Sequence, residues 1–92
     1  TIDYIYRMNL RDLHYLVTLA RLKHFGQAAK FCHVSQPTLS LQLKKLEDTL
    51  GVTLFERDNK SVHLTEIGQK VVEAAHRVLA EAEQLKQLAR AA

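Results

Sequence analysis

The sequence predicts a mainly α-helical domain with one small β-hairpin and a long helix at the end. Three observations support this fold class. Apolar residues between Asn9 and Leu50 recur at spacings of three and four, the period of one face of a helix. Alternating segments flank the turn-forming residues 58–61, as in a hairpin. A helical pattern then runs from Thr65 to about Arg90.

The composition is that of one small soluble domain. The chain has 92 residues, of which 47% are hydrophobic and 25% charged, enough for a single core. No stretch approaches the ~20 apolar residues of a membrane span. Cys32 is the only cysteine, so no internal disulfide is possible, and this favours a reducing, cytoplasmic setting. We expect Cys32 to be a small buried hydrophobe rather than a reactive thiol.

Two helices are predicted in the first third of the chain. The helical pattern begins at Met8, so we expect Met8 to be the natural start and residues 1–7 to be a non-native leader. The first helix is expected over residues 9–22, with Asn9 as its N-cap. The second is short and is expected over residues 25–32.

The third helix is expected over Gln36 to Leu50. Ser35 is a suitable N-cap, and Pro37 falls in the first turn, where its missing N–H leaves no helical hydrogen bond unmade. Gly51 can adopt the left-handed conformation that ends a helix.

A hairpin and a long helix complete the predicted order. The strands are expected over residues 52–57 and 62–64, and Thr65 is the N-cap of the last helix. Gly68 is the weak point of that helix, because glycine lowers helix propensity. Three helices, a hairpin and a long helix make a winged helix-turn-helix with an extension.

The predicted helix-turn-helix motif spans residues 25–44, and the outward face of its second helix carries the candidate chemistry. With Leu39 and Leu43 turned inward, the outward stripe consists of Gln36, Pro37, Ser40, Leu41 and Lys44. Gln can pair with adenine, Ser can meet base edges or phosphate, and Leu or Pro can contact a thymine methyl group. The stripe as a whole therefore indicates a domain that reads the DNA major groove. The alternative, for any single residue of the stripe, is that it is an ordinary solvated surface residue.

The charge distribution supports an anionic partner. The chain has 13 basic and 10 acidic residues, a net charge of +3. Residues 1–64 hold nine Lys or Arg and six Asp or Glu, whereas residues 65–92 hold four of each. The whole excess of positive charge thus lies in the first two thirds of the chain, before the long last helix.

The last helix has an apolar heptad pattern. The two interleaved sets are Val71, Val78 and Leu85, and Ile67, Ala74 and Leu88, with Glu81 as a charged interruption. A helix lying on its own domain is the alternative, and we expect that arrangement for its first two turns. Beyond Val78 little domain is left to cover, so the pattern predicts pairing with a second copy.

Several motifs resemble one known family over nearly the whole chain, from Met8 to about Arg90. They are Ala28-Ala29, Val34-Ser35-Gln36-Pro37-Thr38-Leu39-Ser40, Gln42, Lys45-Leu46-Glu47, Leu50-Gly51-Val52, Leu54-Phe55-Glu56-Arg57, and Leu64-Thr65 with Gly68. As a set they resemble the N-terminal region of LysR-type transcriptional regulators. Residues 32–40 with residues 45–48 are most similar to the peroxide-sensing branch of that family.

The resemblance implies roles for individual positions. Gln36, Pro37 and Ser40 match the recognition-helix contacts, with Thr38 beside them. Lys60 matches the basic residue at the tip of the hairpin that enters the minor groove, and Arg57 lies near the DNA backbone.

This chain departs from the family's pattern at two positions. Leu41 stands where many members carry Arg, and Asp58 adds a negative charge near phosphates.

The resemblance also implies roles for regions outside the DNA interface. The long helix matches the dimer-forming linker helix. The redox-active cysteines of the peroxide branch lie in a C-terminal domain outside this chain, so no sensing role passes to Cys32.

The sequence thus predicts a sequence-specific binding domain for double-stranded DNA. The resemblance implies that it belongs to a dimeric LysR-type regulator, and the similarity to the peroxide-sensing branch implies a peroxide-responsive activator. Residues 8–65 are the expected DNA-binding domain and residues 66–92 the dimerisation helix. The alternative is a winged-helix module that docks on protein. No enzyme activity, cofactor or metal is expected, because catalytic triads, Gly-rich phosphate loops and paired metal-ligand spacings are missing from the sequence.

Overall fold

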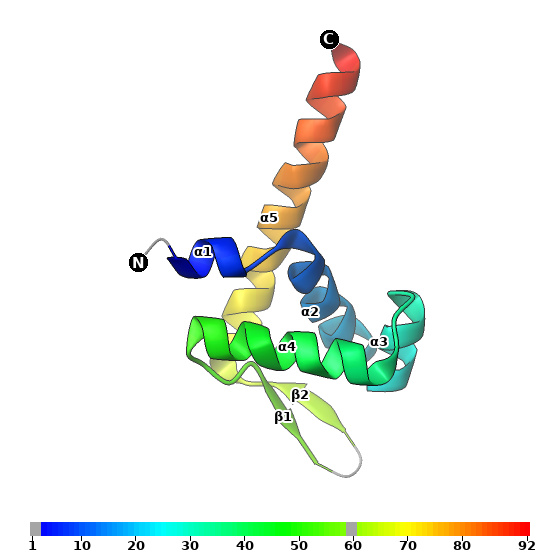
Figure 1. Ribbon diagram of the computed structural model, residues 1–92, viewed down its shortest axis with the longest axis vertical. Coiled ribbons are helices and arrows are strands. Elements are labelled where there is room, and N and C mark those ends of the chain that lie inside the picture. Colours follow the sequence, from blue (N-terminus) through cyan, green and yellow to red (C-terminus); the bar gives the residue numbers. More distant parts are fainter. Residues whose placement is uncertain (1–2, 59–60) are drawn as a thin grey trace.

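The computed structural model describes residues 3–58 and 61–92 and has the predicted fold class. The elements in chain order are α1 (Asp3–Arg7), α2 (Leu10–Leu22), α3 (Phe25–Phe31), α4 (Gln36–Leu50), β1 (Phe55–Arg57), β2 (Val62–Leu64) and α5 (Glu66–Ala91) (Figure 1). The two strands are antiparallel and pair Glu56 with His63 at their centre. We call this hairpin, residues 55–64, the wing.

Helices α2, α3 and α4 form the body of the molecule, and the wing extends from one side of it (Figure 1). The N-terminal part of α5 packs against α2 and β2. The rest of α5 runs away from the body to the C-terminus, which gives the molecule its extents of 50 × 32 × 22 Å. The last helix therefore both closes the core and projects from it.

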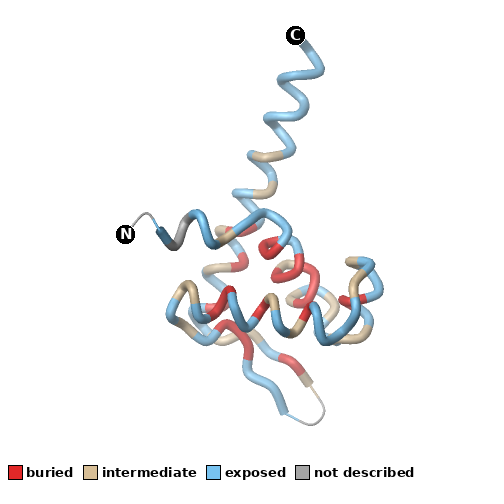
Figure 2. Tube along the Cα trace, in the orientation of Figure 1, coloured by how far each residue is buried: buried red, intermediate tan, exposed pale blue. Residues whose placement is uncertain are grey.

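Leucines make up half of the buried hydrophobic residues that the structure describes. The largest fully buried side chains are Leu16, Leu19, Leu39, Leu43, Leu46 and Leu54. They come from α2, from α4 and from the segment before β1, and burial of each such side chain contributes about 1.5–3 kcal/mol. Among the described residues, the buried ones lie in the body, in both strands of the wing and in the first turns of α5 (Figure 2).

The helix ends lie where the sequence predicts them. Asn9, Ser35 and Thr65 each accept, through the side-chain oxygen, a hydrogen bond from the backbone N–H three residues later, at 2.9, 3.2 and 2.9 Å. Gly51 has a φ of 73° and ends α4, and its N–H donates to the carbonyl of Glu47 at 2.8 Å. The predicted N-caps and the predicted glycine stop are confirmed.

The first strand is shorter than the expected residues 52–57. The backbone before β1 bonds instead to the start of α5. The Thr65 hydroxyl donates to the carbonyl of Thr53 at 2.7 Å, and the Thr65 N–H donates to that of Leu54 at 2.9 Å. Leu54 and Thr65 would be the next pair in the register of the hairpin, but Thr65 is already the N-cap of α5, so the strand pairing ends at Phe55 and Leu64.

Gly68 is not the weak point that its helix propensity predicts. It is buried where α5 crosses the segment before β1, and a Cβ atom at this position would overlap the Leu54 carbonyl oxygen. A glycine is therefore what allows the two backbones to meet, and its packing role outweighs its low propensity.

A further helix lies before the predicted pattern. The sequence indicates helical periodicity from Met8, but α1 already forms over Asp3–Arg7. The side chains of Asp3 and Arg7 are one turn apart and form an ion pair at 2.9 Å. Both are well exposed, so this pair stabilises α1 only slightly.

Candidate nucleic-acid interface

Helix α4 presents the stripe that the sequence predicts. Leu39 and Leu43 are buried against the body, so the opposite side of the helix faces outward. Of the predicted residues, Gln36, Pro37, Thr38, Leu41 and Lys44 are exposed and Ser40 is half-buried. Leu41 has 53% of its surface exposed. Six of the eight predicted contact residues thus lie together on α4.

The first turn of α4 is held by a reciprocal cap. The Ser35 hydroxyl donates to Thr38 Oγ1 at 2.8 Å, and Ser35 Oγ accepts from the Thr38 N–H. Thr38 keeps its own hydroxyl hydrogen for another acceptor. Because the first N–H groups of a helix have no partners within it, this end of α4 also suits an anion such as phosphate.

The turn between α3 and α4 sets the angle of the stripe. Ala28 and Ala29 are buried, and their small side chains let the two helices approach closely. The N–H of Val34 donates to the Ala29 carbonyl at 3.0 Å, and His33 takes the left-handed conformation with a φ of 59°. Cys32 lies at this turn and is half-buried, not fully buried as expected, because α3 ends there.

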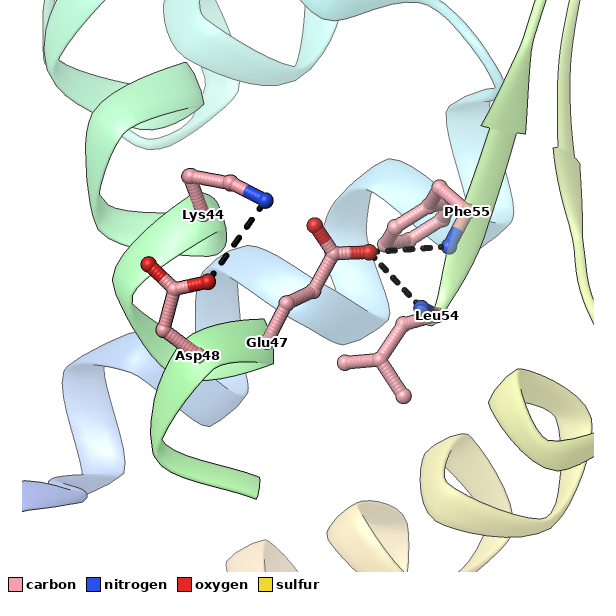
Figure 3. A network of polar contacts seen from close by, with 5 residues as sticks. All are labelled: Lys44, Glu47, Asp48, Leu54 and Phe55. Carbon is pink, nitrogen blue, oxygen red and sulfur yellow. Dashed lines mark hydrogen bonds and ion pairs between the residues drawn. The ribbon is translucent and has the colours of Figure 1, made fainter. Parts of the chain in front are cut away.

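Lys44 ends the stripe with a positive charge that is only loosely held. Its Nζ lies 3.5 Å from Asp48 Oδ1, and both side chains are about two-thirds exposed (Figure 3). Such exposed pairs contribute at most about 1 kcal/mol. The ammonium group can therefore leave Asp48 for a stronger anion.

Glu47 is a buried carboxylate whose structural role the sequence did not predict. It is buried on the inner side of α4, and its Oε2 accepts hydrogen bonds from the N–H groups of Leu54 at 2.7 Å and Phe55 at 3.3 Å (Figure 3). The carboxylate thereby joins α4 to the start of β1. A signal existed, because Glu47 falls four residues after Leu43 and thus on the inward stripe.

The turn of the wing is held by polar bonds among its own residues. Asp58 Oδ1 accepts from the N–H of Ser61 at 2.8 Å and from its hydroxyl at 3.1 Å. Ser61 Oγ also lies 2.7 Å from His63 Nε2. Asp58 is the negative charge that the resemblance places near phosphates. Its carboxylate thus holds Ser61 on the other side of the turn. Lys60, the predicted minor-groove residue, lies outside the described residues.

Arg57, the other predicted wing residue, ends β1 and faces the helix-turn-helix. Its guanidinium carbon lies 4.7 Å from the centre of the Phe25 ring, a cation–π contact. Phe25 is the first residue of α3. The positive charge of Arg57 is therefore stacked against the body.

Asp12 is a buried carboxyl group in the first turn of α2. The pKa of Asp12 is raised overall, because the effect of burial is the largest. The positive charges of Arg11 and Lys45 and the hydrogen bond at Asn9 act in the opposite direction but are weaker. Its Oδ1 is buried without a hydrogen-bond partner among the described residues. The unpaired oxygen makes the ionised form costly in this site.

The predicted seam of α5 divides into two groups. Val71 and Ala74 are half-buried and line, with Val78, a shallow apolar groove of about 200 Å³ whose other wall is Met8, Leu13 and Leu50. Ile67, Val78, Leu85 and Leu88 are exposed, Leu85 by 69% and Leu88 by 60%. The first turns of α5 thus lie on their own domain through Val71 and Ala74, as expected, whereas Ile67 and the seam residues from Val78 onward are exposed.

Residues 3–58 and 61–92 hold neither a cluster of metal-ligating side chains nor a helix that could span a membrane. No group of three His, Cys, Asp or Glu side chains in these ranges could hold a metal ion. In the same ranges no helix combines the length and the apolar character that a membrane crossing needs.

Comparisons with known proteins agree on one family. Residues 10–69 match the family described as bacterial regulatory helix-turn-helix protein, lysR family. The chain is 56% identical over 82 residues to a hydrogen peroxide-inducible genes activator of Pectobacterium carotovorum subsp. carotovorum, a match that covers 89% of this chain and 27% of that protein. It is 55% identical, with the same coverage, to the DNA-binding transcriptional dual regulator OxyR of Escherichia coli K12.

Solved structures show the same likeness. A full-length OxyR variant from Pseudomonas aeruginosa is 54% identical with a TM-score of 0.87, over 91% of this chain and 28% of that one. The CbnR DNA-binding domain in a DNA complex is 38% identical with a TM-score of 0.87, over 91% of this chain and 97% of that one. The chain spans about a quarter of the curated relatives it matches. Its helix-turn-helix, wing and first α5 turn all fall within the matched residues, and the chain belongs to the LysR family of bacterial regulatory helix-turn-helix proteins.

Proposed function

We propose that this chain is a sequence-specific binding domain for double-stranded DNA, with α4 in the major groove and the wing at the minor groove. The observation that carries the proposal is the exposed stripe on α4, from Gln36 to Lys44. Family membership supports it, and so does the likeness to the CbnR domain solved with DNA.

The proposed contacts divide by chemistry. Gln36 reads a base edge through its amide, and Pro37 and Leu41 meet thymine methyl groups. Thr38, Ser40 and Lys44 bond to base edges or phosphates. The wing contributes two cations, Arg57 and Lys60, to the DNA backbone and minor groove.

A selection experiment tests the proposal. The chain is incubated with a pool of duplexes of random sequence, bound duplexes are amplified, and the dissociation constant of the enriched duplex is measured at several salt concentrations. A DNA reader enriches one sequence, and its log affinity falls by about 0.9 per phosphate contact against log salt. A pool that stays random, with a flat salt response, would instead favour a protein-docking winged helix.

We further propose that two copies pair through α5, with residues 8–65 as the DNA-binding domain and residues 66–92 as the dimerisation helix. The proposed seam consists of Ile67, Val71, Ala74, Val78, Leu85 and Leu88. Large apolar side chains as exposed as Leu85 and Leu88 are unusual in a row on one helix of a monomer. Pairing also places two recognition helices on one DNA molecule, so that two weak half-sites make a strong one.

For the longer protein that carries this domain, we propose a cytoplasmic activator of transcription that responds to peroxide and has no enzyme activity. The support is the name of its relatives, hydrogen peroxide-inducible genes activator, at 56% identity. We place the sensing of peroxide outside residues 1–92. Genomic footprinting of the whole protein with and without peroxide tests this, and an unchanged footprint together with unchanged transcripts would contradict it.

A further inference from the structure

One contact joins the wing to the helix-turn-helix at the proposed DNA interface. The Arg57 guanidinium lies 4.7 Å from the centre of the Phe25 ring. These residues are far apart in sequence, at the end of β1 and at the start of α3. The stack therefore connects the two elements that must meet DNA at the same time.

The ring of Phe25 is well placed to act as a fixed support. The preceding residue, His24, caps α3, and its Nδ1 accepts a hydrogen bond from the Gln27 N–H at 3.0 Å. Phe25 itself is half-buried and packs against the core. An arginine side chain has many rotamers, so a fixed aromatic face restricts the guanidinium before any ligand arrives.

The strand that carries Arg57 is held at both of its ends. At its start, the Glu47 carboxylate accepts the N–H groups of Leu54 and Phe55. At its end, Arg57 rests on Phe25. Two attachment points fix the direction of a strand, whereas one attachment would leave it free to pivot.

The charge of Arg57 also remains available. Over residues 3–58 and 61–92, the ion pairs join Asp3 with Arg7 and Lys44 with Asp48, so the Arg57 guanidinium is stacked but not neutralised. Stacking uses the face of the guanidinium and leaves its N–H edge for hydrogen bonds, such as those to phosphate oxygens.

We propose that Phe25 is a positioning residue of the DNA interface, which acts through Arg57 to hold the wing and its charge in place relative to α4. This inference rests on the proposed DNA-binding function. Phe25 needs no contact with DNA in this role. Its effect on affinity must therefore disappear when Arg57 is absent.

A double-mutant cycle tests this dependence. The dissociation constant for the enriched duplex is measured for the wild-type chain, Phe25→Leu, Arg57→Gln and the double variant. We expect Phe25→Leu to weaken binding about two- to fivefold in the wild-type background, as for loss of an exposed cation–π contact. In the Arg57→Gln background the same change should have no further effect. The salt slope should fall in Arg57→Gln, which removes a cation, and by less in Phe25→Leu, which keeps the charge of Arg57.

Two further variants separate positioning from packing. Phe25→Tyr keeps the aromatic face and should retain wild-type affinity. Phe31→Leu is the matched control, because Phe31 also lies on α3 and carries an arginine, Arg21, 4.8 Å from its ring centre, but this pair lies away from the wing. It should leave the affinity unchanged within twofold.

Folding is checked by urea unfolding of every variant, and Phe25→Met, which keeps a large apolar side chain, replaces Phe25→Leu if the latter is not folded. Equal losses from the Phe25 change with and without Arg57 would overturn the proposal, since Phe25 would then act through the fold alone. Failure of the wild-type chain to bind any duplex would instead contradict the proposed function.

Discussion

Asp12 and Glu47 are both buried carboxyl groups, but their surroundings differ. Glu47 accepts two backbone N–H groups, whereas Oδ1 of Asp12 has no hydrogen-bond partner among the described residues. Burial raises the pKa of Asp12, so the fold favours its neutral form. The contribution of Asp12 to stability is therefore fully present below the pKa of an aspartate in the unfolded chain. It is lost as the pH rises through the higher folded value.

Replacing Asp12 with Asn removes this dependence. We expect Asp12→Asn to be more stable than the wild type at pH 7, by roughly 1 kcal/mol, because no charge is then buried. The difference should vanish as the pH falls below the normal range of aspartate. Urea unfolding at several pH values measures it, with Asp48→Asn, at an exposed site, as the control. A less stable Asp12→Asn at pH 7 would show that the attraction of Arg11 and Lys45 is the stronger effect.

Gln36 and Lys60 should differ in the kind of binding they support. Gln36→Ala should cost about 1–3 kcal/mol on the enriched duplex and relax the base preference, because an amide reads a base edge. Lys60→Ala should weaken all duplexes alike and lower the salt slope by about one. Affinities on the enriched duplex and on a scrambled one distinguish these effects. Identical profiles for the two variants would refute the division into reading and anchoring.

At the scale of elements, the two sides of α4 have different roles. Its outward side carries the stripe from Gln36 to Lys44, and its inward side carries Glu47, which holds the start of β1 (Figure 3). The orientation of the wing is thereby linked to the helix that is proposed to read DNA. A change on the inward side should consequently affect the wing without touching the stripe.

Glu47→Ala tests this link. Loss of the carboxylate leaves two backbone N–H groups unpaired, so we expect a loss of stability of about 2–3 kcal/mol and faster hydrogen exchange at Leu54 and Phe55. Glu47→Gln should lose less, because its amide oxygen can still accept. The control is Glu56→Ala, an exposed change on β1 that should stay within about 0.5 kcal/mol. Unchanged exchange rates in Glu47→Ala would exclude a role in holding the wing.

At the scale of the whole molecule, charge and apolar surface are separated. The net charge of +3 comes from residues 1–64, whereas residues 65–92 are neutral and carry the exposed leucines of α5. In a pair of chains the total of about +6 would face DNA from two bodies joined by a neutral arm. This separation suits the two proposed roles, which are attraction of DNA by residues 1–64 and pairing of two chains through residues 65–92.

A charged seam should abolish the pairing. The double change Leu85→Glu and Leu88→Glu places like charges where apolar side chains are proposed to meet, so sedimentation should report a monomer where the wild type is a dimer. The enriched duplex should also be bound more weakly, because two half-sites no longer cooperate. The control is Gln84→Glu with Gln87→Glu, which adds the same charge beside the seam. A wild-type chain that sediments as a monomer would contradict the proposed pairing.

Short-range features were open to prediction, and long-range ones were not. The caps at Asn9, Ser35 and Thr65 join residues three apart, so the sequence shows both partners. Glu47 meets Leu54 and Phe55 from a neighbouring element, and its carboxylate could equally have been a solvated side chain. The helix α1 was missed because five residues are too few to show an apolar periodicity.

The sequence by itself determined the order of the elements from α2 onward, the helix ends and the exposed stripe on α4, because these depend on helical period and on local hydrogen bonds. Only the tertiary structure decided the role of Gly68, which lets α5 meet the Leu54 carbonyl, and the contact between Phe25 and Arg57. The physical reason is that close packing selects partners by their distance in space. Residues far apart in sequence become neighbours only when the core leucines bring their elements together.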